Sequence, residues 1–307
     1  MSGLRGAVDV GANAVRGFLI GMAELVPGVS GGTVALVTGV YDELVESAAN
    51  AVGALGRVAR GPDRAAAARQ GVRDVRLRLL VPLLLGMVAA VLSVAGTMEA
   101  FVAEHPEAAR GLFLGLVVVS IVVPVRMARS EGGSFSWREG ALVLGAAVLA
   151  FALVGLAGGA VVEDPPLPLV AAVAAVAVCA LVVPGVSGSF LLLAVGLYSA
   201  TLTAVDERDL AYVAAFGLGA VVGLATFVRL LQWLLEHHRR ATLLTMAGLM
   251  AGSLRALWPW QDGSGAEAGT GALVAPYDPV GLPLLLAALG AAVVAVVVVV
   301  QARQERA

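Results

Sequence analysis

The sequence predicts an all-α polytopic membrane protein built as an inverted-topology repeat, in which each half is a re-entrant helical hairpin followed by three transmembrane helices. Composition is the first reason: of 307 residues, 59% are hydrophobic and only 14% are charged, a balance that excludes a water-soluble domain. The second is that apolar blocks of roughly 17–25 residues recur, the length that a helix needs to cross a hydrocarbon core. The third is a Pro-Gly-Val-Ser-Gly sequence that occurs twice.

The first apolar stretch, at about residues 10–47, is broken in its middle by Pro27 and Gly28. A proline beside glycines ends a helix and frees backbone groups, which are tolerated at membrane depth only where protein or water surrounds them. Arg5 precedes the stretch, and seven arginines follow it within residues 57–78. Because positively charged loops stay in the cytoplasm, both ends lie there, and the stretch is predicted to be a hairpin that enters from the cytoplasm.

Six apolar stretches without such a break are predicted to be full spans: residues 77–95, 111–125, 140–162, 210–235, 241–257 and 280–300. They lack the strict alternation that is typical of membrane strands. The loop after the first span is acidic, the loop after the second carries three arginines, and the loop after the third is acidic again. This alternation places successive loops outside, inside and outside the membrane.

A second broken stretch, at about residues 167–205, is interrupted by Pro184 and Gly185. It starts at an outer loop and ends at the acid-rich residues 206–209, so it is predicted to be a hairpin that enters from outside. The three spans that follow place the C-terminus, like the N-terminus, in the cytoplasm. Residues 1–165 and 166–307 are therefore predicted to be two inverted repeats within one integrated membrane domain, as in many secondary transporters.

The two halves align residue by residue. Residues 27–31 match residues 184–188, and Gly39 with Tyr41 matches Gly196 with Tyr198, at a constant offset of 157 residues. A five-residue identity followed by the same Gly-x-Tyr at the same distance indicates an internal repeat.

Each break is a candidate anion site. A loop followed by a new half-helix turns unpaired backbone N–H groups and the positive end of the helix dipole toward the membrane centre. Hydroxyl groups add donors, and glycines let a ligand approach the backbone. The candidate binding residues are Ser30, Gly31, Gly32 and Thr33 at the first break and Ser187, Gly188 and Ser189 at the second. The alternative is a pair of packed turns whose serines only cap the half-helices.

Ionisable residues at membrane depth cost of order 3 kcal/mol and are functional candidates by default. Arg16 and Arg229 are candidate phosphate ligands, although each lies close enough to a membrane surface to extend toward it instead. Glu24 precedes Pro27 by three residues, where its charge would be poorly solvated. It is a candidate for proton coupling, and an ion pair with Arg16 or Arg229 is the alternative. Arg255, at the outer end of the fifth span, is a candidate for binding lipid phosphate or for a headgroup contact without selectivity.

Three ordered motifs resemble the DUF368 family: GMAELVPGVSGGT at residues 21–33, PGVSGS at 184–189 with Gly-Leu-Tyr at 196–198, and GLMAGSLRALWPW at 248–260. The resemblance spans nearly the whole chain. It implies a multi-pass translocase of the bacterial cytoplasmic (inner) membrane that returns undecaprenyl phosphate, the carrier lipid of cell-wall synthesis, to the cytoplasmic leaflet. The implied partner is a polyprenyl phosphate in the membrane, with protons as a candidate coupling ion, and we expect no nucleic acid, cofactor, metal or catalytic residue.

Two rival functions stay open from the residues alone. A small-anion or solute transporter of the same repeat type would have a closed vestibule open to water, whereas a lateral gap beside the hairpins would favour a lipid. An intramembrane phosphatase acting on undecaprenyl pyrophosphate has a Pro-Gly-x-Ser motif that continues with Arg. Gly31 and Gly188 follow the serines here, so the cation that would stabilise the developing charge is missing.

Overall fold

The computed structural model describes residues 2–25, 30–60, 76–132, 134–156, 162, 164–262 and 271–304. Apart from one isolated bridge between Gln261 and Leu273, the regular elements of these residues are helices. Five of the described helical segments are long and apolar enough to cross a membrane: Leu77–Val94, Pro106–Ser130, Trp137–Gly155, Leu210–His237 and Gly281–Val300. The all-helical, multi-pass character predicted from the sequence is confirmed.

The helices follow the chain in two similar series. The first series is α1 (Ser2–Glu24), α2 (Gly31–Val37), α3 (Tyr41–Arg60), α5 (Leu77–Glu104), α6 (Pro106–Ser120), α7 (Val122–Ser130) and α8 (Trp137–Leu156). The second series is α9 (Leu167–Val182), α10 (Gly188–Val195), α11 (Tyr198–Asp206), α12 (Leu210–His237), α13 (Arg239–Ser253), the 3-10 helix η1 (Leu254–Leu257) and α14 (Gly281–Gln304). The predicted span at 241–257 corresponds to a helix of 15 residues followed by a 3-10 turn of four residues.

Both series share local geometry at equivalent positions. Helices α5 and α12 have 28 residues each, and α6 and α13 have 15 each. The short helices α2 and α10 both end at a glycine in the left-handed region, Gly39 with φ of 75° and Gly196 with φ of 79°. The amide after each glycine donates to the carbonyl five residues earlier, at 3.0 Å in the first series and 2.9 Å in the second. Only glycine adopts this conformation without strain, which explains the repeated Gly-x-Tyr.

Helix pairs also repeat. Helix α1 packs along α5, and α9 packs along α12; α6 packs along α14, and α13 along α8. Glycines allow the close approach in each pair, because a Cβ at Gly17 would meet the Leu83 carbonyl and one at Gly219 would meet the Ala171 carbonyl. Since α6 and α13 each pack against the last helix of the other series, the two halves interlock into one body.

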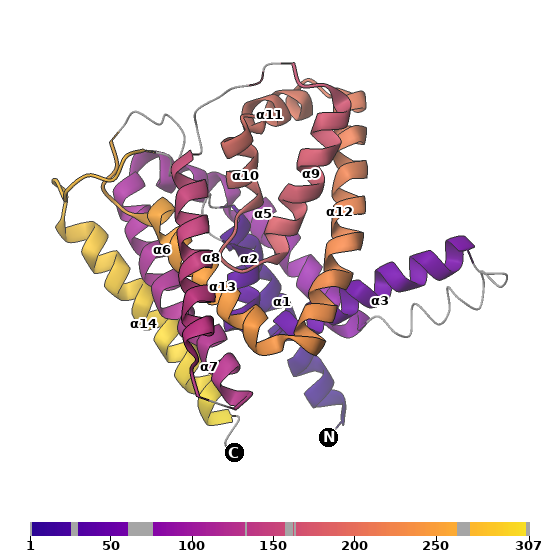
Figure 1. The fold of residues 1–307 in the computed structure, drawn as a ribbon, viewed down its shortest axis with the longest axis horizontal. Coiled ribbons are helices and arrows are strands. Elements are labelled where there is room, and N and C mark those ends of the chain that lie inside the picture. The colour runs from indigo at the N-terminus through magenta and orange to yellow at the C-terminus, as the bar shows by residue number, and fades with distance from the viewer. Residues whose placement is uncertain are drawn as a thin grey trace.

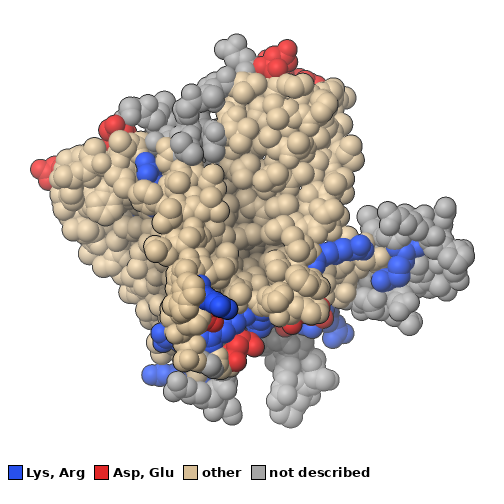
Figure 2. Space-filling view, in the orientation of Figure 1, with Lys and Arg blue, Asp and Glu red and all other residues tan. Residues whose placement is uncertain are grey.

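Charged side chains gather at two opposite edges, with a band of uncharged residues between them (Figure 2). At one edge, Arg239 pairs with Asp42 and Glu131, and Arg240 pairs with Glu139. Glu131, Glu139, Arg239 and Arg240 lie in or next to two loops that the sequence predicts to be cytoplasmic, and Asp42 lies near the end of the first predicted hairpin. At the other edge, segments predicted to be outside are joined by further hydrogen bonds: Tyr277 to Glu107 at 3.1 Å and Arg110 to the Pro259 carbonyl at 3.4 Å.

The helices beside the two sequence breaks lie on different sides of the molecule (Figure 1). Helices α9 and α10 extend from the side on which α11 lies, whereas α1 begins at the opposite side, which is also where α14 ends. Large apolar side chains are exposed on the outer helices, for example Leu92 at 82% and Leu85 at 65% on α5. Such surfaces are unfavourable in water and suit contact with lipid.

Candidate functional site

The ends of the two broken hairpins contact each other near the centre of the fold. The Ser30 hydroxyl donates to the Val183 carbonyl at 3.4 Å, and the Gly185 amide donates to the Thr33 hydroxyl at 3.2 Å. The Tyr41 hydroxyl donates to the Val182 carbonyl at 3.0 Å. Helix α9 ends at this point, which leaves its last carbonyls without helical partners. Side chains of the first hairpin therefore cap the broken end of the second.

The first hairpin end also satisfies its own helix start. Ser30 precedes α2 with an extended backbone but makes no capping bond within that helix. Instead, the Gly31 amide donates to Glu24 Oε1 at 2.8 Å. A carboxylate is a natural partner for free N–H groups at the start of a helix. Glu24 thus bonds to the start of α2, where the sequence predicts an anion site, and Ser30, Gly31 and Gly32 are buried.

The second hairpin end is packed on one side and open on the other. Pro184 is fully buried, and Gly185 has a φ of 85° against Met250 of α13, where a Cβ would lie 2.5 Å from the Met250 Cα. Gly188 is buried at the start of α10. Ser187 lines a cavity. Pro27 and Gly28, together with the side chain of Ser189, lie outside the described residues.

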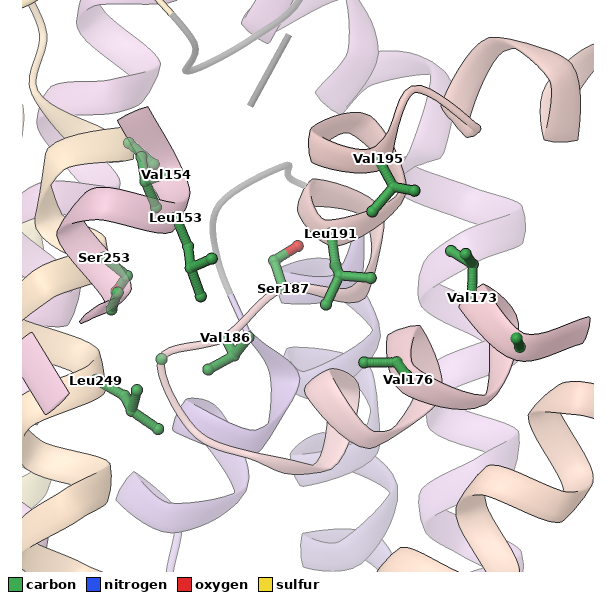
Figure 3. A pocket seen from close by; sticks show the side chains of 14 residues that line it. Leu153, Val154, Val173, Val176, Val186, Ser187, Leu191, Val195, Leu249 and Ser253 are labelled. Carbon is green, nitrogen blue, oxygen red and sulfur yellow. The ribbon is translucent and has the colours of Figure 1, made fainter. Parts of the chain in front are cut away.

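That cavity has a volume of about 410 Å³ and lies between α8 and α13 on one side and α9 and α10 on the other. Figure 3 shows Leu153 and Val154 on one wall and Val173, Val176 and Leu191 on the facing wall, with Ser187 between them. Among the fourteen residues that line the cavity, only Ser187 and Ser253 have polar side chains. We call this cavity the tip pocket. An apolar lining with few polar groups is typical of sites for largely apolar ligands.

The candidate arginines are dispersed. Arg16 donates to the Asn13 amide oxygen at 2.8 Å, and Asn13 in turn donates to the Arg78 carbonyl at 3.4 Å, which places Arg16 near the edge predicted to be cytoplasmic. Arg229 lies beside α3, where a Cβ at Gly53 would be 3.9 Å from its guanidinium. Within the described residues, neither arginine forms an ion pair with Glu24, so that alternative for Glu24 does not occur.

Arg255 is placed differently, in η1 at the end of α13. Its guanidinium carbon lies 4.6 Å from the centre of the Phe151 ring on α8. A Cβ at Gly155 would clash with the same guanidinium, so the guanidinium fits there because residue 155 has no side chain. Ser253 and Ala256, on either side of Arg255 in the chain, both line the tip pocket.

Some contact residues did not stand out in the sequence as site residues. Tyr41 belongs to the repeated Gly-x-Tyr, and the repeat was the available signal for it, although its hydroxyl contact with α9 depends on tertiary structure. Leu249 and Ser253 lie within the third family motif at 248–260. Phe151 and Gly155 carry no local signal, because they are an aromatic and a small residue in an ordinary apolar span.

The fold and the site together define a multi-pass, all-helical membrane protein with an apolar cavity beside its second helix break. A family model described as VCA0040-like, undecaprenyl phosphate translocase-like, matches residues 20–271. The chain belongs to this family, and the family prediction from the three motifs is confirmed.

Curated relatives agree with that assignment. The chain is 33% identical over 250 residues to a polyprenyl-phosphate transporter of Vibrio cholerae, an alignment that covers 81% of this chain and 77% of the relative. It is 26% identical over 264 residues to a polyprenyl-phosphate transporter of Staphylococcus aureus, which covers 80% of this chain and 86% of that relative. No solved structure matches.

Proposed function

We propose that this protein translocates a polyprenyl phosphate, undecaprenyl phosphate in the cell, across the bacterial cytoplasmic membrane. The observation that carries the proposal is the tip pocket. This apolar cavity is lined in part by Ser187, which belongs to the repeated motif that the sequence predicts to bind an anion. A lipid monophosphate needs an apolar space for its chain next to a polar position for its phosphate. The relatives named polyprenyl-phosphate transporters support this choice of lipid.

The proposed architecture is an inverted repeat of residues 1–165 and 166–307, with the hairpins entering from opposite faces and both termini in the cytoplasm. The matched turns at Gly39 and Gly196 and the repeated helix pairs support this arrangement. Transporters built in this way expose a central site to alternate sides by moving one repeat against the other. The phosphate would pass between the two hairpin ends, which are the polar elements nearest the centre.

Glu24 has a specific part in this mechanism. Its carboxylate takes the Gly31 amide that a phosphate would otherwise bind. Protonation of Glu24 would remove a negative charge from this position and let the lipid phosphate take its place. Coupling to protons follows from that exchange, because the acid and the phosphate compete for one donor.

A soluble-anion transporter is less well supported. Its pathway would need polar groups that replace the hydration of the ion, whereas twelve of the fourteen lining residues of the tip pocket are apolar. A phosphatase would need a cation beside the serines. Of the candidate arginines, Arg16 binds Asn13, Arg229 lies beside α3, and Arg255 lies over the Phe151 ring.

The test is translocation of undecaprenyl phosphate by the purified protein in liposomes, measured as accessibility of the phosphate to an enzyme added outside. Ser30→Ala/Ser187→Ala should lower the rate at least tenfold. The matched control is Ser93→Ala on the exposed face of α5, where the hydroxyl only bonds back to the Ala89 carbonyl. Transport of inorganic phosphate in place of the lipid would disprove the proposal.

A further inference from the structure

The tip pocket has a charged residue at its rim that the mechanism above leaves unused. Arg255 lies between two residues that line the pocket, and its guanidinium covers Phe151 on α8, beside the lining residues Ala150 and Val154. Phe151 is 43% exposed on the outer surface of the bundle. The positive charge therefore lies at the boundary between the pocket and the surface that faces lipid.

Within the described residues, no acidic side chain pairs with Arg255. Its position is maintained by the Phe151 ring and by the space over Gly155. A guanidinium on an aromatic face keeps its N–H donors free for a planar or tetrahedral anion. Such donors bind phosphate oxygens in pairs, which gives strong and oriented contacts.

We propose that Arg255 and the tip pocket form the loading site for the lipid at the face where α13 ends: the guanidinium binds the phosphate, and the pocket takes the isoprene units nearest to it. This inference rests on the proposed function. The volume of about 410 Å³ falls within the range of roughly 300–1,000 Å³ that is typical of small-ligand sites. The pocket thus suits the first part of a long chain, and the rest of the chain extends into the bilayer.

The chemistry of the pocket selects among membrane lipids. Leu153 and Val176 face each other across it and stay 52% and 54% exposed, so they present apolar surface without filling the space. An apolar wall with one cation at its rim matches a lipid that has one compact anionic group on an apolar chain. A neutral polyprenol lacks the partner for Arg255.

From the rim, the phosphate has a short polar route inward. Ser253 and Ser187 are the two polar side chains in the lining, and Ser187 lies at the hairpin end. The order Arg255, then Ser187, therefore takes the phosphate from the surface to the centre. The same order predicts that Arg255 affects the initial binding of the lipid more than the passage of the lipid phosphate between the hairpins.

Binding to the purified protein in detergent tests this site, with undecaprenyl phosphate as the ligand and undecaprenol as the neutral control. Leu153→Trp on α8 and Val176→Trp on α9 should each fill the pocket and weaken binding at least tenfold. Val148→Trp is the matched control, since Val148 lies on α8 with 59% exposure and does not line the pocket. It should bind as the wild type does.

The rim is tested in the same assay. Arg255→Ala should weaken binding of the phosphate lipid about tenfold and leave undecaprenol unchanged, and Gly155→Ala should weaken it less by displacing the guanidinium. Arg138→Ala is the control, because Arg138 also lies over an aromatic ring on α8, that of Trp137, but at the other end of the helix. On the unmodified protein, farnesyl phosphate should compete with the long lipid, and inorganic phosphate should not.

The outcomes separate the two proposals. If the wild type binds undecaprenyl phosphate but farnesyl phosphate fails to compete and the Trp variants bind normally, the loading site is wrong, and transport of the lipid in liposomes decides the proposed function separately. If the wild type binds undecaprenol as tightly as the phosphate lipid, both proposals are wrong. Losses confined to the pocket and Arg255 variants support the site.

Discussion

The two hairpin ends carry the same five residues and the same glycine turn, yet they have different surroundings. Ser30 and Thr33 of the first end are each 4% exposed and bond to the second hairpin. Ser187 of the second end lines the tip pocket. The same motif thus contributes to the contact between the two hairpins at one end and to the lining of a cavity at the other.

The halves also differ in sequence and in helix length around these ends. Glu24 bonds to the start of α2, whereas Leu181 stands at the matching place in the second half. After α6 the first half continues as the nine-residue α7, whose Val123 joins an apolar cluster with Leu36 of α2 and Val298 of α14, and the three residues also line a second cavity of about 280 Å³. The second half has the four-residue η1 at that point, and Ala256 of η1 lines the tip pocket.

The largest expected effect is on the packed side of the second end. Gly185→Ala should destabilise the protein by about 2–4 kcal/mol, because it adds left-handed strain and a clash with the Met250 backbone. The thermal midpoint in detergent measures this loss. Gly145→Ala on α8 is the control, since a Cβ there meets nothing within 4 Å. A Gly185→Ala protein as stable as the control would mean that the turn is not held against α13.

The next largest effect is expected when Glu24 is replaced by leucine, the residue at the matching position 181 of the second half. Glu24→Leu copies the second half and should cost about 1.5–3 kcal/mol, the range for a hydrogen bond to a charged group. Glu24→Gln keeps an acceptor for Gly31 and should lose less. Under the proposed coupling, both variants should show a flat dependence of transport rate on pH. A Glu24→Gln protein that keeps the wild-type pH profile would remove this residue from the coupling.

A smaller effect is expected from the contact between the ends. Tyr41→Phe removes the bond to the Val182 carbonyl and should cost about 1 kcal/mol. Its repeat equivalent provides the control: Tyr198→Phe should change stability by no more than about 0.5 kcal/mol. Equal losses in the two variants would contradict the asymmetry between the hairpins. The measurement is again the thermal midpoint of each purified variant.

The smallest effect concerns the charged edge. Asp42 pairs with Arg239, and the second half has Ser199 at the matching position. Asp42→Ser should cost about 0.2–1 kcal/mol, since both side chains are partly exposed and such pairs contribute little. High salt should reduce the difference between variant and wild type. A loss several times larger would show that this pair holds the first hairpin in place.

Much of this architecture follows from local sequence. The apolar blocks predict helices of membrane length, and the motif predicts where helices α1 and α9 end, because proline and glycine act on the nearest residues. The start of α10 at Gly188 and the turns at Gly39 and Gly196 follow for the same reason. Charge patterns predict which loops gather at one edge, since membrane depth separates charged from apolar residues.

What the sequence by itself determined is therefore the class of protein, the positions of the breaks and the repeat that relates them, all of which depend on properties of neighbouring residues. Only the tertiary structure decided that Glu24 bonds to Gly31, that the first hairpin caps the second, and that Arg255 lies over Phe151 at the rim of a pocket. These contacts join different helices or the two helices on either side of a helix break. Each of these side chains has many potential partners of similar chemistry in the sequence. Which partner it contacts depends on how the helices pack, so no local sequence pattern specifies the contact.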